Sequence, residues 1–344
     1  MIKKAKIVIM ILVVLISAIG CTAKTEVVDE MAEEVDSTIQ IGMCFDSFII
    51  ERWERDRDAF VSKCSDELGV EVNVQSANGN VSLQSDQIDY LIGQEVDVIV
   101  VIAVESEGIA EAVQRAKEAG IKVIAYDRMV YNADVDLYIT FDNTQVGILM
   151  AEAIVDEVGT EAEILMISGP LEDNNVKLVN DGFFSVINET NCTIVGLEYA
   201  TGWIAEYGFD YVNEYIDNGV EFDVVMCGND DIASQVFKAL SENRLAGEVV
   251  VVGQDAELGA CQRIVEGAQT MTVYKPIEEM AQIAAEYAVQ LANHEDIQVE
   301  DTIYDGMYDV PYVGLEPTAI TIANIDVVID AGYHMQEDVY LYVD

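Results

Sequence analysis

The chain has 344 residues, of which 64 are acidic and 17 basic, giving a formal net charge of −47. Such a chain is a poor partner for nucleic acid and for anionic membrane surfaces. Its hydrophobic content of 51% excludes an intrinsically disordered protein, because highly charged disordered chains are poor in apolar residues. The excess negative charges repel one another at low salt. The composition therefore indicates a protein with an acidic surface that works at high ionic strength.

The N-terminus has the pattern of a secretion signal. Three lysines start the chain, an apolar run follows, and the small residues Ala18 and Gly20 come just before Cys21. The run is shorter than the roughly 20 residues that a transmembrane helix needs. We therefore predict that residues 1–20 are a lipoprotein signal peptide and that Cys21 carries the lipid. An uncleaved signal anchor is the alternative.

Residues 21–37 are acidic, poor in apolar side chains and free of Gly and Pro, as in a flexible tether. Residues 1–20 contain three lysines and no acidic residue, so their removal takes the net charge from −47 to −50. The chain that remains, about 300 residues, is long for a single core and indicates two domains.

The first half of this remaining chain alternates short apolar runs with helical patterns. In chain order we expect strand 38–44, helix 51–68, strand 72–74, helix 82–92, strand 96–103, helix 108–119, strand 123–126 and strand 137–141. Apolar runs of this length, with helices between them and turn-length links, predict a parallel, doubly wound sheet.

The second half repeats the pattern. We expect helix 145–158, strand 164–167, helix 176–187, strand 193–197, helix 207–216, strand 224–227, helix 232–243, strand 249–252, helix 258–267 and strand 270–274. A long helix at 276–293 follows, and the tail from 303 to 344 alternates short apolar runs with Gly and Pro and has one helix-like run at 325–331. The fold class is therefore α/β, with two lobes in tandem and several crossings that form a hinge.

Catalysis and metal binding have little support in the sequence. The chain has two histidines, His294 and His334, and both lie in acidic C-terminal segments. It has no nucleophile elbow, Walker loop, dinucleotide fingerprint, zinc motif or calcium loop, so we predict no enzyme activity, no metal and no cofactor. After Cys21 five cysteines remain, an odd number without metal-ligand spacing, and we interpret most of them as buried thiols.

Polar and aromatic residues follow the predicted strands, where parallel sheets bind ligands. They are Arg52-Trp53, Asp127-Arg128, Asp173-Asn174-Asn175, Gly202-Trp203, Asn229-Asp230, Gln254-Asp255 and Lys275. Flat aromatic faces cover the C–H faces of a sugar ring, while carboxylates, amides, Arg and Lys bond its hydroxyls. Simpler interpretations stay open: a solvated charge pair for Asp127-Arg128, core packing for each tryptophan, and helix caps for Asn229-Asp230 and Gln254-Asp255.

These residues lie in strings that resemble the periplasmic sugar-binding proteins of the ribose/galactose/xylose class, with the xylose-binding branch most similar. The strings include VQSANGN at 74–80, AYDRM at 125–129 and QTMTVYKP at 269–276. The resemblance spans residues 39–333. It implies the type I periplasmic binding protein fold, with residues 38–142 and 275–311 in an N-terminal sugar-binding lobe and residues 143–274 and 312–344 in a C-terminal one.

The resemblance also implies the ligand contacts. They fall on Arg52, Trp53, Asp127, Arg128, Asn175, Trp203, Asn229, Asp255 and Lys275. The two tryptophans would sandwich the sugar ring, and Asn174 is the alternative to Asn175. Lys275 resembles the xylose binders, since ribose binders carry an amide at that position.

The function implied is an extracytoplasmic solute-binding lipoprotein, a monomer held to the outer face of the membrane only by the lipid on Cys21, or a periplasmic protein. It would capture a monosaccharide, D-xylose, and deliver it to the permease subunits of an ABC transporter. Two alternatives remain: a sensor lobe that presents sugar to a membrane receptor kinase or chemoreceptor, and the binding of ribose, glucose or arabinose. A secreted carbohydrate-active enzyme is a rival of another class.

Overall fold

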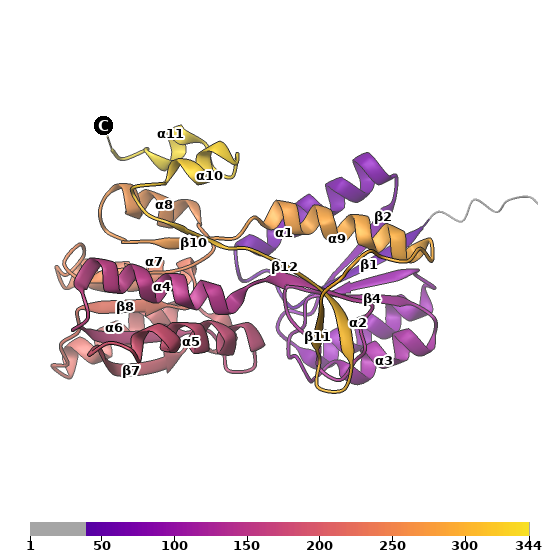
Figure 1. Cartoon of the computed structure of the whole chain (residues 1–344), viewed down its shortest axis with the longest axis horizontal. Helices are drawn as coiled ribbons and strands as arrows, with labels where there is room; N and C mark the ends of the chain where they lie inside the picture. The colour runs from indigo at the N-terminus through magenta and orange to yellow at the C-terminus, as the bar shows by residue number, and fades with distance from the viewer. Residues whose placement is uncertain (1–38, 344) are drawn as a thin grey trace, which may run out of the picture. The chain divides into compact units, whose positions relative to one another are not determined.

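A computed structural model describes residues 39–343, so the predicted signal peptide, the tether and Cys21 lie outside the described residues. The described residues form an N-lobe and a C-lobe, each an α/β unit with its own main sheet (Figure 1). Within this range no helix combines the length and the apolar content needed to cross a membrane.

The N-lobe is a parallel sheet with helices on both faces. Its elements are β1 (Gln40–Phe45), α1 (Arg52–Ser62), the π-helical turn η1 (Lys63–Leu68), β2 (Glu71–Ser76), α2 (Val81–Gly93), β3 (Val98–Val101), α3 (Ala110–Glu118), β4 (Lys122–Tyr126), β5 (Leu137–Phe141), α9 (Ile277–Ala292), β11 (Thr302–Tyr304) and β12 (Asp309–Leu315). The strand order is β11-β12-β5-β4-β3-β1-β2, and only the β11–β12 pair is antiparallel.

Alternating side chains of the N-lobe strands enter two different cores. In β3, Val98 and Val100 belong to the core under α1 and α9, while Ile99 and Val101 belong to the core under α2 and α3. Side chains of a strand point to opposite faces, so a continuous apolar run such as β3 requires cover on both faces. Figure 1 shows α1 and α9 on one side of this sheet and α2 and α3 on the other.

The C-lobe repeats this arrangement with a shorter sheet. Its elements are α4 (Asn143–Val158), β6 (Glu163–Ser168), α5 (Asn174–Ile187), β7 (Thr193–Tyr199), the 3-10 turn η2 (Thr201–Trp203), α6 (Glu206–Asp217), β8 (Val224–Cys227), α7 (Asp230–Glu242), β9 (Val250–Val252), α8 (Leu258–Val265), β10 (Thr272–Tyr274), β13 (Thr318–Ile320), α10 (Asp326–Asp330) and α11 (Gln336–Val339). The main sheet has the order β7-β6-β8-β9, and β10 pairs with β13 in an antiparallel ribbon.

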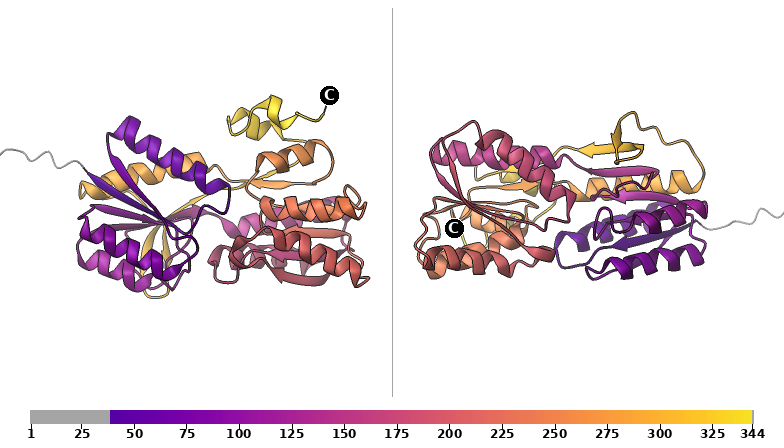
Figure 2. Two further views of the ribbon diagram at one scale, coloured as in Figure 1. Left: turned by 180° about the vertical axis from the view of Figure 1, so that it is seen from behind. Right: turned by 90° about the horizontal axis from the view of Figure 1, so that it is seen from below.

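Two glycines allow α4 and α5 to pack backbone against backbone. A Cβ atom on Gly147 would lie 1.9 Å from the carbonyl oxygen of Val179, and one on Gly182 would lie 2.0 Å from that of Thr144. No side chain fits at either position without moving a helix. This close pair covers one face of the C-lobe sheet, while α6 and α7 cover the other (Figure 2).

The chain crosses between the lobes three times, after β5, after β10 and after β12. The architecture confirms the predicted fold class of two doubly wound parallel-sheet lobes joined by several crossings. The lobe limits remain a proposal. β12 pairs with β5 from Tyr312 to Leu315, so strand pairing favours a last crossing after Leu315 rather than after residue 311.

The tail is more regular than its sequence pattern indicated. The described tail contains β11, β12, β13, α10 and α11. Short strands that contain Gly and Pro, as β12 does, give weak local signals, and β12 joins the main sheet by pairing with β5, which is remote in sequence. The predicted helix 51–68 is also divided, because the α-helical part ends at Ser62 and a π-helical turn continues to Leu68.

Candidate functional site

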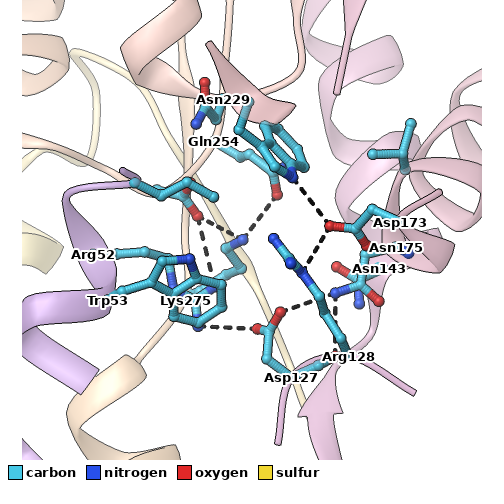
Figure 3. Close-up of a pocket in the computed structure, with 14 residues that line it drawn as sticks. Arg52, Trp53, Asp127, Arg128, Asn143, Asp173, Asn175, Asn229, Gln254 and Lys275 are labelled. Carbon is cyan, nitrogen blue, oxygen red and sulfur yellow. Dashed lines mark hydrogen bonds and ion pairs between the residues drawn. The ribbon is translucent and has the colours of Figure 1, made fainter. Parts of the chain in front are cut away.

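The nine predicted site residues line one pocket at the carboxyl ends of strands of both lobes (Figure 3). They are Arg52, Trp53, Asp127, Arg128, Asn175, Trp203, Asn229, Asp255 and Lys275. The pocket contains about 370 Å³ of space not filled by atoms, part of it open to solvent.

Arg52 is the first residue of α1 and is buried, with 4% of its surface exposed. Its guanidinium donates to Asp56 one turn along the helix, at 3.1 Å, and its Nη2 lies 2.9 Å from Oδ2 of Asp127. Burial by itself would lower the pKa of Arg52, but Asp127, Asp56 and Asp255 together raise it well above its usual range. The pocket therefore contains a fixed positive charge.

Asp127 adopts a left-handed backbone conformation, with φ of +62°. Such a φ is costly for a residue with a side chain and persists only where neighbours hold it. Here the Thr140 hydroxyl donates to the Asp127 carbonyl oxygen at 2.7 Å, and the Tyr138 hydroxyl donates to it at 3.2 Å. The two residues of β5 thus hold the turn that presents the Asp127 carboxylate to the pocket.

Asn175 and Arg128 make contacts between the lobes across the pocket. Asn175 Nδ2, at the start of α5, donates to Oδ1 of Asp127 at 2.9 Å. Arg128 Nε lies 2.8 Å from Oδ2 of Asp173, an ion pair whose N–H does not point at the oxygen. Arg128 Nη1 also donates to Asp46 and to the carbonyl oxygen of Ala103. Burial raises the pKa of Asp173 although Arg128 lowers it.

Lys275 follows β10 at one of the crossings. Its Nζ lies 2.5 Å from Oδ1 of Asp255 and donates to Oε1 of Gln254 at 3.0 Å. Arg52 Nη1 lies 3.9 Å from the same Asp255 oxygen. Asp255 therefore sits between two cations, and it too has a positive φ, of +98°.

The tryptophans occupy different surroundings. Trp53 is 2% exposed, and the Arg52 guanidinium carbon lies 4.4 Å from its ring centroid. Trp203 is 9% exposed and donates from Nε1 to Oδ2 of Asp173 at 3.2 Å. Its ring needs the glycine at position 169, where a Cβ would come within 2.4 Å of it. Both indoles line the pocket, and their stacking on a sugar ring stays a prediction.

Several buried polar atoms of the pocket have no hydrogen-bond partner among the described residues. Arg128 Nε and Asp255 Oδ1 are two of them, and both lie in ion pairs. The other three are Trp53 Nε1, Asn175 Oδ1 and Asn229 Nδ2. A buried polar group without a partner costs about 1–3 kcal/mol, so such groups mark places where a ligand supplies the missing bond. Two of these three atoms are donors and one is an acceptor, a set that suits hydroxyl groups, which both donate and accept.

The residues whose roles were left open lie in different surroundings. Asn175 lines the pocket, whereas Oδ1 of Asn174 accepts from the Tyr131 hydroxyl at 2.5 Å, outside the pocket lining. Asn229 caps α7 by accepting from the Ile232 amide at 2.9 Å, yet its Nδ2 stays free for a ligand. Asp230 does not line the pocket: it is buried, and its carboxylate accepts from Thr272 and Gln269.

Five lining residues were not among the predicted contacts: Ile50, Asn143, Asp173, Val176 and Gln254. The sequence marked Asp173 and Gln254 as polar residues at strand ends, but nothing in the sequence showed that they face Arg128 and Lys275. Asn143 comes after the predicted strand 137–141, where the sequence indicated only that the chain passes from one lobe to the other. Ile50 and Val176 are apolar, so neither was expected in a polar site.

A C-terminal segment supports the Asp255 turn from behind. The Tyr333 hydroxyl donates to the Asp255 carbonyl oxygen at 3.2 Å, and Nε2 of His334 lies 2.7 Å from the Ala256 carbonyl oxygen. Arg55 of α1 donates to the Tyr333 carbonyl oxygen at 3.0 Å. The segment thus contacts both lobes and holds one wall of the pocket.

This segment makes stability depend on pH. Burial lowers the pKa of His334 below its ordinary value of 6.5, against the Ala256 carbonyl, which raises it. As the pH falls below 6.5 the unfolded chain takes up this proton first, so the free energy of unfolding decreases. We expect His334→Gln, which keeps a donor for Ala256, to lose less stability than the wild type between about pH 7 and about pH 5 in urea unfolding. The exposed His294 supplies the control His294→Gln; an equal loss in all three proteins would contradict the expectation.

Two facing α/β lobes, three crossings and a polar pocket at the strand ends of both lobes define a two-lobed solute-binding protein. The chain belongs to the periplasmic binding protein family, whose domain model matches residues 41–296.

Relatives of known name support this assignment. The chain is 40% identical over 308 residues to the D-xylose-binding periplasmic protein of Haemophilus influenzae, covering 88% of this chain and 92% of that protein. It is 42% identical over 306 residues to the protein of the same name from Escherichia coli, covering 87% and 92%. Among solved structures, the carbohydrate transporter solute-binding protein of Chloroflexus aurantiacus in complex with D-glucose matches with a TM-score of 0.80 and 25% identity, covering 88% and 98%.

Proposed function

We propose that this protein binds a monosaccharide, D-xylose, in the pocket between its lobes and delivers it to the permease of an ABC transporter. The observation that carries the proposal is the pocket itself, where fixed charges, planar amides, two indoles and unpartnered polar atoms from both lobes converge. Planar polar groups bond sugar hydroxyls directionally, and indoles cover the apolar faces of the ring. The two D-xylose-binding relatives support the choice of sugar.

Seven of the nine predicted residues that line the pocket take the following roles in this proposal. Asp127, Arg128, Asn229 and Asp255 bond hydroxyls, Lys275 selects for xylose, and Trp53 and Trp203 cover the ring. Closing the lobes removes water and strengthens each of these hydrogen bonds. The protein releases its ligand unchanged, acts as a monomer, and is held outside the membrane by a lipid on Cys21.

A thermal-shift screen tests the choice of sugar. The protein from Lys24 onward is melted at low and at molar salt with D-xylose, D-ribose, L-arabinose, D-glucose or D-galactose. Ligands that bind only the folded state raise the melting temperature by mass action, so a selective rise with D-xylose is expected. A rise with another sugar alone would keep the class and reject xylose. No rise in a folded protein would contradict sugar binding.

The second candidate is the binding of D-glucose, which the Chloroflexus structure holds. The same screen separates it from xylose. Transport and sensing share the pocket, and growth on D-xylose after deletion of the gene separates them: loss of sugar uptake supports the importer, whereas intact uptake with lost induction supports a sensor for a membrane kinase or chemoreceptor.

A further inference from the structure

Three carboxyl groups from both lobes meet beside the sugar pocket, outside its lining. Glu51 immediately precedes α1 of the N-lobe, Asp231 lies in the first turn of α7, and Glu257 immediately precedes α8. One carboxylate oxygen from each of the three lies within 4.8 Å of the other two. Like charges at this distance repel, so a bare cluster of this kind opposes the contact between lobes that forms it.

The most buried member lacks a partner. Glu257 is 8% exposed, and its Oε1 has no hydrogen-bond partner among the residues that the structure describes. The carboxylates of Asp230 and Asp255 add further negative charge around Glu257. Burial first, and then the charges of Asp231, Asp230 and Asp255, raise the pKa of Glu257 well above its usual range.

Arg263 is a buried cation close to this cluster. Arg263 lies close enough to interact with Glu257 and Asp230. However, its Nε donates to Oε1 of Gln269 and its Nη1 to the hydroxyl of Ser234, both at 2.9 Å, and its Nη2 donates to no partner among the described residues. Arg263 therefore does not donate a hydrogen bond to Oε1 of Glu257, which has no donor among residues 39–343.

We propose that Glu51, Asp231 and Glu257 bind a hard divalent cation such as Ca²⁺, which bridges the two lobes beside the sugar. Carboxylate oxygens are the ligands that Ca²⁺ prefers, at 2.3–2.6 Å, so oxygens on opposite sides of one ion lie about 4.8 Å apart. The three oxygens of the cluster lie within this distance of one another. Three protein oxygens leave the remaining positions to water, and one ligand is exposed, so the affinity expected is weak, on the order of 10⁻⁴–10⁻³ M.

The cluster is connected to the sugar pocket through the chain itself. Glu51 is adjacent to Arg52, Asp231 follows Asn229 by two positions, and Glu257 follows Asp255 by two. The site needs both lobes, so it is complete only when they are closed, and a cation bound there favours the closed form. Because linkage is reciprocal, the cation then tightens sugar binding, and sugar tightens cation binding. This part of the inference rests on the proposed sugar binding.

The test uses the full-length protein in mild non-ionic detergent, freed of metals with a chelating resin. D-xylose binding is measured by calorimetry in millimolar CaCl₂, in MgCl₂ and in NaCl of equal ionic strength. Melting without sugar is measured in the same three salts. Glu51→Gln is the main variant, because Glu51 is exposed and its loss spares the core, and Glu257→Gln is the second. Glu54→Gln, which removes an exposed carboxylate one turn further along α1, is the matched control.

We expect CaCl₂ to lower the Kd for xylose about fivefold to tenfold in the wild type and in Glu54→Gln, and to have no effect in Glu51→Gln or Glu257→Gln. An equal response of all four proteins, or no response of the wild type, would overturn the inference. Tighter xylose binding at lower pH without a calcium effect would also overturn the inference, because a proton shared by the carboxylates would then take the place of the cation.

If no sugar binds in any salt, the proposed function fails. A calcium-dependent rise in melting temperature that Glu51→Gln abolishes would still support the cation site, and the absence of such a rise would reject the cation site.

Discussion

Replacing Arg128 by methionine is expected to lower the free energy of unfolding by about 3–5 kcal/mol, the cost of breaking a buried charge cluster. Arg128 is 3% exposed and contacts Asp46 and the Ala103 carbonyl in its own lobe and Asp173 in the other. Methionine keeps most of the volume but leaves two buried carboxylates without their cation. Urea unfolding of the sugar-free protein measures the loss.

Arg115→Met is the matched control for this prediction. Arg115 pairs with Asp89 at 2.8 Å, but its side chain is 42% exposed, so the pair is screened by solvent. An exposed ion pair contributes about 0–1 kcal/mol. A loss of similar size in both variants would show that the burial of Arg128 is not what makes it important. Adding Asp173→Asn to Arg128→Met should recover part of the stability, because one of the two buried carboxylates left without a cation is then removed.

Trp203→Ala is expected to weaken D-xylose binding by about 2 kcal/mol or more, which is about 30-fold in Kd. The indole lines the pocket, packs against Gly169, and orients Asp173 through its Nε1. Truncation removes the apolar surface proposed to cover the sugar ring and leaves Asp173 with one donor fewer. Isothermal calorimetry on wild type and variant measures the change.

The control for this variant is an aromatic side chain far from the pocket. Tyr304 in β11 is 62% exposed and does not line the pocket, so Tyr304→Ala should bind xylose as the wild type does. Melting curves without sugar separate a loss of binding from a loss of fold. An unchanged Kd in a folded Trp203→Ala protein would remove Trp203 from the proposed site.

The order of elements followed from local patterns. Buried parallel strands such as β3 are continuous apolar runs, and the helices between them have apolar stripes, so the type and order of the elements up to β10 were predictable. The pocket was predictable in outline because the carboxyl ends of parallel strands are where such folds bind ligands. The tail was not: β12 and β13 are short, and each depends on a partner strand far away in sequence.

The sequence by itself determined the two-lobed α/β architecture and the kinds of side chain at each strand end. Only the tertiary structure decided which of them meet: Arg128 with Asp173, Asn175 with Asp127, and Lys275 with Asp255 and Gln254. It also decided that Asp127 adopts a positive φ and that Asn175, rather than Asn174, lines the pocket. The physical reason is that these features depend on distances between atoms of separate elements, and in most cases of separate lobes, whereas periodicity and turn signals report only on neighbours along the chain.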